Sequence, residues 1–133
     1  MSNNVGEIRL PQIDAILAYL PTFERKGFQF GQWRAQPGRF PHVSLSSEAE
    51  AFVRALSSQE IMVVFDWTRW RAEVSDPTAL GQADLLALRK LLTFHVRADR
   101  FSEGHLISVF EKGHITAILR RLAEIRRQIA EAS

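Results

Sequence analysis

The chain has 133 residues, no cysteine and a formal net charge of +2 at pH 7. We expect a single globular domain over residues 1–133, and the absence of cysteine excludes disulfides and thiol catalysis. No apolar run is long enough to span a membrane, and the N-terminal residues lack the apolar core of a signal peptide. We therefore expect a cytoplasmic protein without a membrane partner.

The charge is unevenly distributed along the chain. Residues 1–84 carry 8 basic and 10 acidic side chains, whereas residues 85–133 carry 9 basic and 5 acidic ones. The positive charge is concentrated at Arg120, Arg121, Arg126 and Arg127. These arginines indicate either a solvated helix face with local counter-ions, which is favoured, or a surface for phosphate, nucleic acid or an acidic protein.

The first predicted element is a helix that begins near Leu10. Pro11 suits its first turn, where a missing N–H costs nothing. Its apolar residues repeat at helical spacing, at Ile13, Ile16, Leu17 and Leu20. Pro21 stops or kinks the helix.

A small antiparallel sheet is expected next. Pro37-Gly38 is typical of a tight turn, which predicts a hairpin that pairs roughly residues 28–34 with 39–44. Ile61–Phe65 is short, apolar and partly β-branched, so we predict a further strand there.

Four helix starts follow along the chain. Ser47 with Glu50 forms a capping box, Asp84 can cap a later helix, and Ser102 can cap a short helix with Glu103 in its first turn. The helix after Asp84 has a buried stripe at Leu85, Leu88, Leu91, Leu92 and His95 or Val96. Gly113 supplies a left-handed cap before a last helix with apolar residues at Ile115, Ile118, Leu119, Leu122, Ile125 and Ile129. The predicted class is α+β: a mostly helical single domain with a small antiparallel sheet and a C-terminal helical hairpin.

A dense group of charged residues lies between two of these apolar stripes. It contains Arg97, Asp99, Arg100 and Glu103. Burying such charges is costly unless they are paired, so we predict a cluster that is at least partly buried and internally paired. It is either a structural ion-pair network, which is favoured, or a site where the two guanidinium groups bind a carboxylate or phosphate.

Neighbouring side chains extend the ligand hypothesis. Asp66 and Trp67 follow the predicted strand at Ile61–Phe65, where chain ends often present functional groups. The expected ligand-binding residues are Asp66, Trp67, Arg97, Arg100, Glu103 and His105. Candidate catalytic groups for acid–base chemistry are Asp99, Glu103 and His105. Trp67 and Trp70 could stack on a ligand ring, although a place in the core is favoured.

No metal or cofactor is predicted. His95, Asp99 and Glu103 have helical i, i+4 and i+8 spacing, but Ser102-Glu103-Gly104 should break the helix. The remaining histidines lack the spacing of a metal site, and there is no GxSxG, phosphate loop or GxGxxG.

Residues 103–112, Gly113 and residues 115–129 have the outline of a helix-turn-helix with a basic second helix. Lys112 and His114 flank Gly113, where apolar residues would normally pack. An ordinary helical hairpin is therefore favoured.

Two motifs resemble a family of small stand-alone bacterial and archaeal proteins of unknown function. The first is R-x-D-R-F-x-E-G, from Arg97 to Gly104, and the second is G-x-I-x-x-I-L-x-R-L, from Gly113 to Leu122. The segment Phe65–Trp67 is also similar. This resemblance implies no activity.

We expect a binding module for a small anionic ligand or a protein partner, and its size suggests a mobile-element accessory or inhibitor protein. The second interpretation is a nucleic-acid-binding protein that uses the C-terminal arginines. The third is a small enzyme that uses carboxylate and histidine acid–base groups.

Overall fold

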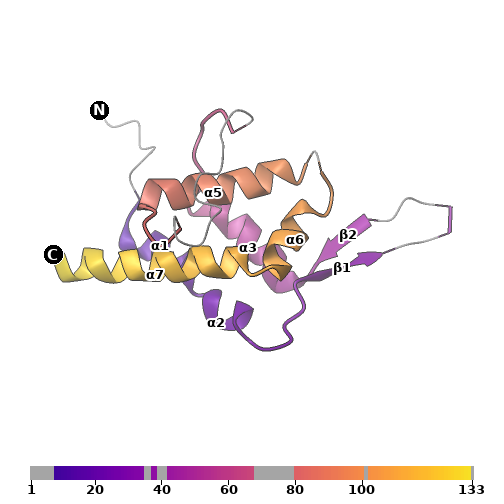
Figure 1. The fold of residues 1–133 in the computed structure, drawn as a ribbon, viewed down its shortest axis with the longest axis horizontal. Helices are drawn as coiled ribbons and strands as arrows, with labels where there is room; N and C mark the ends of the chain where they lie inside the picture. Colours follow the sequence, from indigo (N-terminus) through magenta and orange to yellow (C-terminus); the bar gives the residue numbers. More distant parts are fainter. Residues whose placement is uncertain (1–7, 35–36, 39–41, 68–79, 101, 133) are drawn as a thin grey trace.

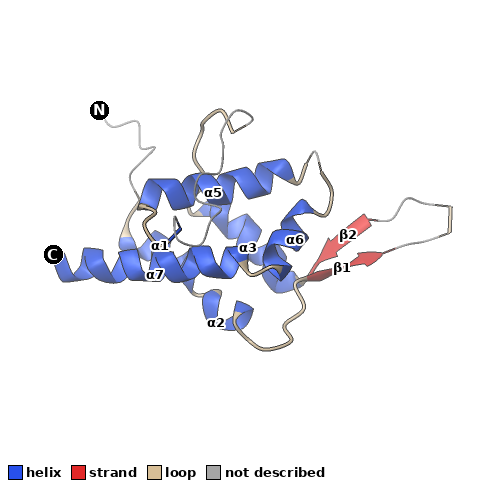
Figure 2. Ribbon diagram, viewed as in Figure 1, coloured by secondary structure: helices blue, strands red, loops and turns tan. Residues whose placement is uncertain are grey.

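The computed structural model describes residues 8–34, 37–38, 42–67, 80–100 and 102–132 (Figure 1). The helices in these ranges are α1 (Leu10–Leu17), α2 (Leu20–Phe23), α3 (Ser47–Ser58), α5 (Leu85–Ala98), α6 (His105–Glu111) and α7 (His114–Ala132). Strands β1 (Gly31–Arg34) and β2 (His42–Leu45) form one antiparallel sheet (Figure 2). The prediction of a mostly helical α+β fold with a small antiparallel sheet and two C-terminal helices is confirmed.

Helix α7 provides one wall of the core and contacts α1, α2, α5 and α6. Figure 1 shows it running alongside the body of the molecule, with the β-hairpin projecting from one end. Its apolar stripe is buried at Ile115, Ile118, Leu119, Leu122 and Ile125, as the spacing predicted, whereas Ile129 of the same predicted stripe is exposed. No helix in the described ranges is long and apolar enough to cross a membrane.

An aromatic cluster anchors the hairpin to the helices. The ring of Phe23 in α2 lies 5.3–5.5 Å, between centroids, from those of Phe30, Phe52 and Phe110. Phe30 also stacks on Phe110, which belongs to α6. The strand pairing begins at Gly31, rather than at residue 28 as predicted, and the Phe30 carbonyl accepts one further main-chain hydrogen bond, from the Ser46 N–H at 2.9 Å.

The predicted start of the first helix is confirmed, with a proline in its first turn. The helix ends at Leu17, and Pro21 lies at the start of the separate helix α2. The hairpin pairs Gly31 with Leu45 and Arg34 with His42. Part of the predicted second strand, residues 39–41, lies outside the described residues.

The segment Ile61–Phe65 is not a strand, contrary to the prediction. Two buried side chains of α5 bind its main chain instead. Arg89 Nε donates to the Ile61 carbonyl over 2.8 Å, and the Val63 N–H donates to Thr93 Oγ1 over 3.0 Å. Because side chains satisfy this backbone, the apolar segment packs without a partner strand.

Asp84 caps α5 as predicted, because its Oδ1 accepts a hydrogen bond from the Ala87 N–H at 2.8 Å. The capping box at Ser47 is wrong by one residue. Ser46 is the N-cap of α3 and accepts from the Ala49 N–H at 3.2 Å, while Glu50 pairs with Arg54. The difference arises because β2 ends at Leu45 and leaves Ser46 extended, as an N-cap residue must be.

Candidate functional site

The turn between α5 and α6 is the centre of the candidate site. We call Asp99, Arg100, Ser102, Glu103 and Gly104 the α5–α6 corner. Ser102 does not cap α6, contrary to the prediction, and Glu103 precedes the helix, whose N-cap is Gly104 with φ +93°. Asp99 supplies the missing acceptor, since its Oδ1 lies 3.0 Å from the Leu106 N–H. A carboxylate from the end of α5 therefore satisfies an N–H in the first turn of α6.

The corner is joined to the β-hairpin by Glu103. Its Oε2 accepts a hydrogen bond from the Val43 N–H at 3.0 Å, so this carboxylate covers the outer edge of β2. Trp33 of β1 also contacts the corner, because a β-carbon at Gly104 would overlap its indole ring. Gly104 is thus required for its positive φ and for the close approach of Trp33.

A surface pocket of about 300 Å³ lies between the hairpin and the corner. We call it the acidic pocket. Three carboxylates, those of Glu50, Asp99 and Glu103, lie in its wall. The other lining residues are Val43, Ser44, Leu45, Leu106 and Ile107. The pocket therefore combines an apolar surface with negative charge.

Two histidines meet between α5 and α6. Nδ1 of His95 on α5 lies 3.0 Å from Nε2 of His105 on α6, and His95 is only 8% exposed. Burial, with smaller contributions from the neighbouring His105 and His114, lowers the pKa of His95 to about 4. Burial also lowers the pKa of His105, although the charge of Asp99 opposes that shift. Both rings are therefore neutral at pH 7, so that one can donate and the other accept.

The predicted internal pairing of the charged cluster is wrong. Within the described residues, no ion pair or side-chain hydrogen bond joins Arg97 or Arg100 to Asp99 or Glu103. Arg97 is half-buried and Arg100 is exposed. The reason is that Glu103 turns toward the Val43 N–H of β2 and Asp99 toward the Leu106 N–H of α6, and these two N–H groups have no other acceptor in the described ranges.

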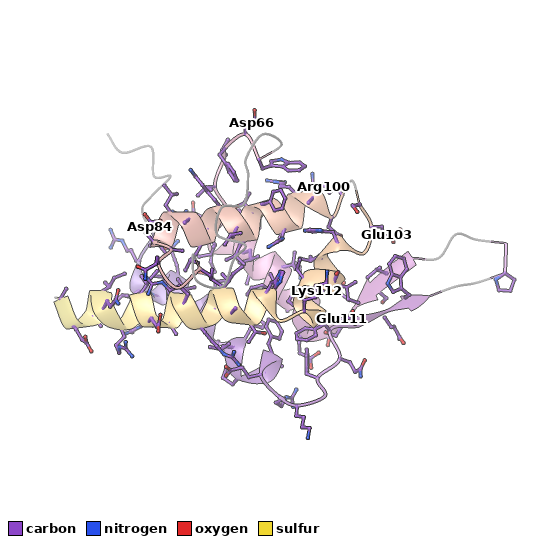
Figure 3. All side chains as sticks on the ribbon, in the orientation of Figure 1. Asp66, Asp84, Arg100, Glu103, Glu111 and Lys112 are labelled. Atoms are coloured by element: carbon purple, nitrogen blue, oxygen red, sulfur yellow. The ribbon has the colours of Figure 1, made fainter. Side chains whose placement is uncertain are left out.

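The predicted ligand-binding residues do not meet in one place. Figure 3 shows Arg100 and Glu103 at the end of α5 nearest the hairpin, whereas Asp66 lies apart from them, beyond α5. Trp67 packs against Phe94, with ring centroids 6.2 Å apart, and Phe94 in turn contacts the ring of His105. Of the predicted set, only Glu103 lines the acidic pocket. Trp70 lies outside the described residues.

The helical spacing of His95, Asp99 and Glu103 is not realised, because α5 ends at Ala98. No group of three or more histidine and acidic side chains is arranged to bind a metal ion in the part of the chain that the structure describes. Asp99 and His105 interact electrostatically, but Asp99 is bound to Leu106 and His105 to His95.

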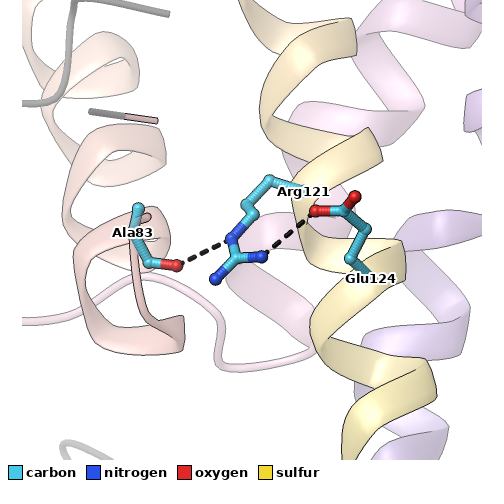
Figure 4. Close-up of polar contacts among 3 residues, drawn as sticks. All are labelled: Ala83, Arg121 and Glu124. Carbon is cyan, nitrogen blue, oxygen red and sulfur yellow. Dashed lines mark hydrogen bonds and ion pairs between the residues drawn. The ribbon is translucent and has the colours of Figure 1, made fainter. Parts of the chain in front are cut away.

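The C-terminal arginines bind to other parts of the protein. Arg126 forms two hydrogen bonds with Asp14 of α1, and Arg120 pairs with Glu24 at the end of α2. Arg121 donates to the Ala83 carbonyl over 2.9 Å and to Glu124 over 3.1 Å (Figure 4). Arg127 lies 3.9 Å from Glu131. These contacts agree with the favoured interpretation of a helix face with local counter-ions.

Three residues of the site were missed by the sequence analysis. Trp33 and Val43 were only positions in the predicted hairpin, and Glu50 was assigned to a capping box. Glu50 precedes Asp99 by more than a third of the chain, so no local pattern could place them together. The signal that was available is Gly104, because a glycine beside a charged cluster permits both a positive φ and a close contact.

The sequence matches the family of unknown function DUF6508 over residues 8–128. No curated protein and no solved structure matches the chain. The match extends from α1 almost to the end of α7 and includes the hairpin and the α5–α6 corner. The chain therefore belongs to the family of unknown function DUF6508.

Proposed function

We propose that this protein is a binding module that captures a basic side chain of a protein partner in the acidic pocket. The observation that carries this proposal is the way in which two carboxylates are held. Asp99 binds the Leu106 N–H through Oδ1, and Glu103 binds the Val43 N–H through Oε2. Each carboxylate keeps its second oxygen for a ligand, in a direction fixed by the fold.

The charge of the pocket favours a cation over the small anion expected from the sequence. Among the described residues, its lining contains three carboxylates and no arginine or lysine. Glu50 is already paired with Arg54, so the negative charge offered to a ligand comes from Asp99 and Glu103. Val43, Leu45 and Leu106 would contact the aliphatic stem of an arginine or lysine, while the charged end meets the carboxylates.

The size and the rim of the pocket favour a side chain of a protein over a free ligand. A volume of about 300 Å³ is at the small end for sites that enclose a whole small molecule. Trp33 lies beside the pocket, on the corner glycine, and is 56% exposed. Exposed tryptophans are enriched among the residues that dominate protein interfaces, and tryptophan attracts cations through its ring face.

The proposal is tested by titrating the ¹⁵N-labelled protein with N-acetyl-arginine methylamide and following main-chain amide signals by NMR. We expect saturable shifts at Val43 and Leu106, whose N–H groups bind the pocket carboxylates. N-acetyl-glutamate methylamide is the matched control and should produce no such shifts. Equal or larger shifts with the glutamate probe would contradict the proposal.

Variants that remove charge but keep shape make the test specific. Glu103→Gln and Asp99→Asn keep an oxygen that can accept the main-chain hydrogen bond, so the fold should persist. Both should weaken arginine binding, whereas Glu48→Gln, at an exposed carboxylate of α3 outside the pocket, should not. Unchanged arginine binding in both pocket variants would exclude the pocket as the site.

A further inference from the structure

His105, the first residue of α6, is linked to the acidic pocket through Asp99. The next residue, Leu106, lines the pocket, and its N–H donates to Asp99 Oδ1 over 3.0 Å. Asp99 lines the pocket too, and it interacts electrostatically with the His105 ring. A change in the charge of His105 therefore acts on a carboxylate of the pocket, although His105 is not one of the described lining residues.

The contact between His95 and His105 can hold one proton more than its neutral form. When His105 is charged, its Nε2 can still donate to Nδ1 of a neutral His95, which lies 3.0 Å away. His95 is buried, whereas His105 is half-buried, and burial disfavours the charged form of a histidine. The additional proton therefore belongs on His105, the ring that is linked to the pocket.

Ionisable groups from three helices act on the charge of His105. Burial has the largest effect and lowers the pKa of His105 below its usual value of 6.5. The charges of Lys112 on α6 and His114 on α7 lower the pKa further, whereas Asp99, the C-cap of α5, raises it. His95 of α5 is the fourth group, through its contact with Nε2. His105 is therefore neutral at neutral pH and takes up a proton in mildly acidic solution.

We infer that His105 makes the acidic pocket sensitive to pH, so that a basic side chain is held near neutral pH and released on acidification. This inference rests on the proposed function and adds its regulation. A proton on His105 brings a positive charge beside Asp99, which then competes with the cationic end of the ligand for the same carboxylate. Because binding free energies are linked, a bound cation must disfavour the proton on His105 to the same extent.

The affinity for N-acetyl-arginine methylamide tests the inference, with the amide signals of Val43 and Leu106 as the readout. Carboxyl groups ordinarily titrate near pH 4, so a comparison of about pH 7.5 with about pH 5 tests the histidine rather than the carboxylates. Binding should be strongest where His105 is neutral, and the dissociation constant should rise several-fold as the pH falls through the pKa of His105.

The outcomes of this titration separate the inference from the proposed function. An absence of saturable binding at the higher pH would contradict the proposed function itself. Binding that is present at the higher pH and equally tight at the lower pH would overturn the inference and leave the proposed function standing.

His105→Gln isolates the charge of His105 from the other effects of acidity. Glutamine is neutral at every pH, and its amide can still donate to or accept from His95. The variant should bind the arginine probe like the wild type at the higher pH and keep that affinity at the lower pH. His114→Gln, at an exposed histidine of α7, is the matched control and should lose affinity on acidification as the wild type does. An equally steep loss in His105→Gln would overturn the inference.

The reciprocal effect is measured in the wild-type protein, so it does not depend on the folding of any variant. NMR signals of the His105 ring are followed as the pH is varied, with and without a saturating concentration of the arginine probe. The bound probe should lower the pKa of His105, because the cation near Asp99 repels the proton. N-acetyl-glutamate methylamide should leave the pKa unchanged. A pKa of His105 that is the same with and without bound arginine probe would overturn the inference.

Discussion

Nδ1 of His95 and Nε2 of His105 lie 3.0 Å apart and join α5 to α6. His95 is buried, and the rings of Phe94 and His105 pack against it. One of the two facing nitrogens must accept the hydrogen bond that the other donates, so the contact is lost when both rings are charged and both nitrogens are donors. The packing of these two helices is therefore linked to protonation.

The first prediction concerns the pH dependence of stability. The pKa of His95 is about 4 in the folded protein, below the value of about 6.5 in an unfolded chain. The unfolded chain therefore binds the proton first as the pH falls. The contribution of His95 is full above about pH 6.5 and declines as the pH approaches about 4. We expect a loss of about 2 kcal/mol of unfolding free energy between about pH 7.5 and about pH 5.

Urea unfolding at several pH values measures this loss. His95→Gln should remove most of the pH dependence in this window, because the titrating group is absent. His114→Gln, at an exposed histidine, should retain most of it. A pH dependence that survives unchanged in His95→Gln would assign it to other groups.

The second prediction concerns Arg89, whose buried guanidinium binds main-chain carbonyls that a partner strand would otherwise bind. It donates to the Ile61 carbonyl over 2.8 Å and to the Glu60 carbonyl over 2.9 Å. Arg89→Met would fill similar space but leave these acceptors without their donor, at a cost of about 2–4 kcal/mol. Arg54→Met, at an exposed arginine paired with Glu50, should change stability by about 0.5 kcal/mol or less. Equal effects of the two substitutions would show that Arg89 has no special role.

The sequence predicted interactions between residues that are close together in the chain, and it missed those between residues far apart in the chain. Asp84 was placed correctly because an N-cap binds an N–H three residues later in the chain. His95 was placed in a buried stripe by its spacing, yet its contact with His105 depends on how two helices meet. Ile61–Phe65 has a strand composition, but its main chain is satisfied by Arg89 and Thr93 about thirty residues later.

The same distinction explains the candidate site. The sequence showed that Asp99 and Glu103 are charged. Their predicted partners were Arg97 and Arg100, because these arginines are their neighbours in the chain. The actual donors are the main-chain N–H groups of Leu106 and Val43, and the second of these lies 60 residues away. Side-chain patterns carry no information on which main-chain N–H groups lack partners, so only the fold could identify them.

The third prediction addresses the nucleic-acid interpretation. We expect no nanomolar binding to random duplex DNA at physiological salt, because the arginines of α7 already bind Asp14, Glu24, Glu124 and Glu131. Fluorescence anisotropy at low and physiological salt measures this, since phosphate contacts weaken steeply with salt. Asp14→Asn should release Arg126 and strengthen binding at low salt. Nanomolar binding by the wild type that persists at physiological salt would reverse this conclusion.

The fourth prediction separates the two reasons why residue 104 is a glycine, which are its positive φ and the close approach of Trp33. Gly104 has φ +93° and lies against Trp33, whereas Gly113 has φ +83° and no atom near the position of a β-carbon. Gly113→Ala should therefore cost only the backbone strain, about 1 kcal/mol. Gly104→Ala carries that strain and also displaces the indole ring, so we expect a cost of about 2 kcal/mol or more.

Urea unfolding of the two glycine variants in a Trp33→Ala protein separates the steric cost of displacing the indole ring from the cost of backbone strain. In a Trp33→Ala protein, Gly104→Ala should cost about as much as Gly113→Ala, because the ring is no longer in the way. Gly113→Ala should cost the same with and without Trp33, since the two residues share no contact. If Gly104→Ala cost no more than Gly113→Ala in the wild-type background, the Trp33 ring would not be held against the corner. The rim of the acidic pocket would then lack the fixed aromatic side chain that the proposed recognition of a basic partner uses.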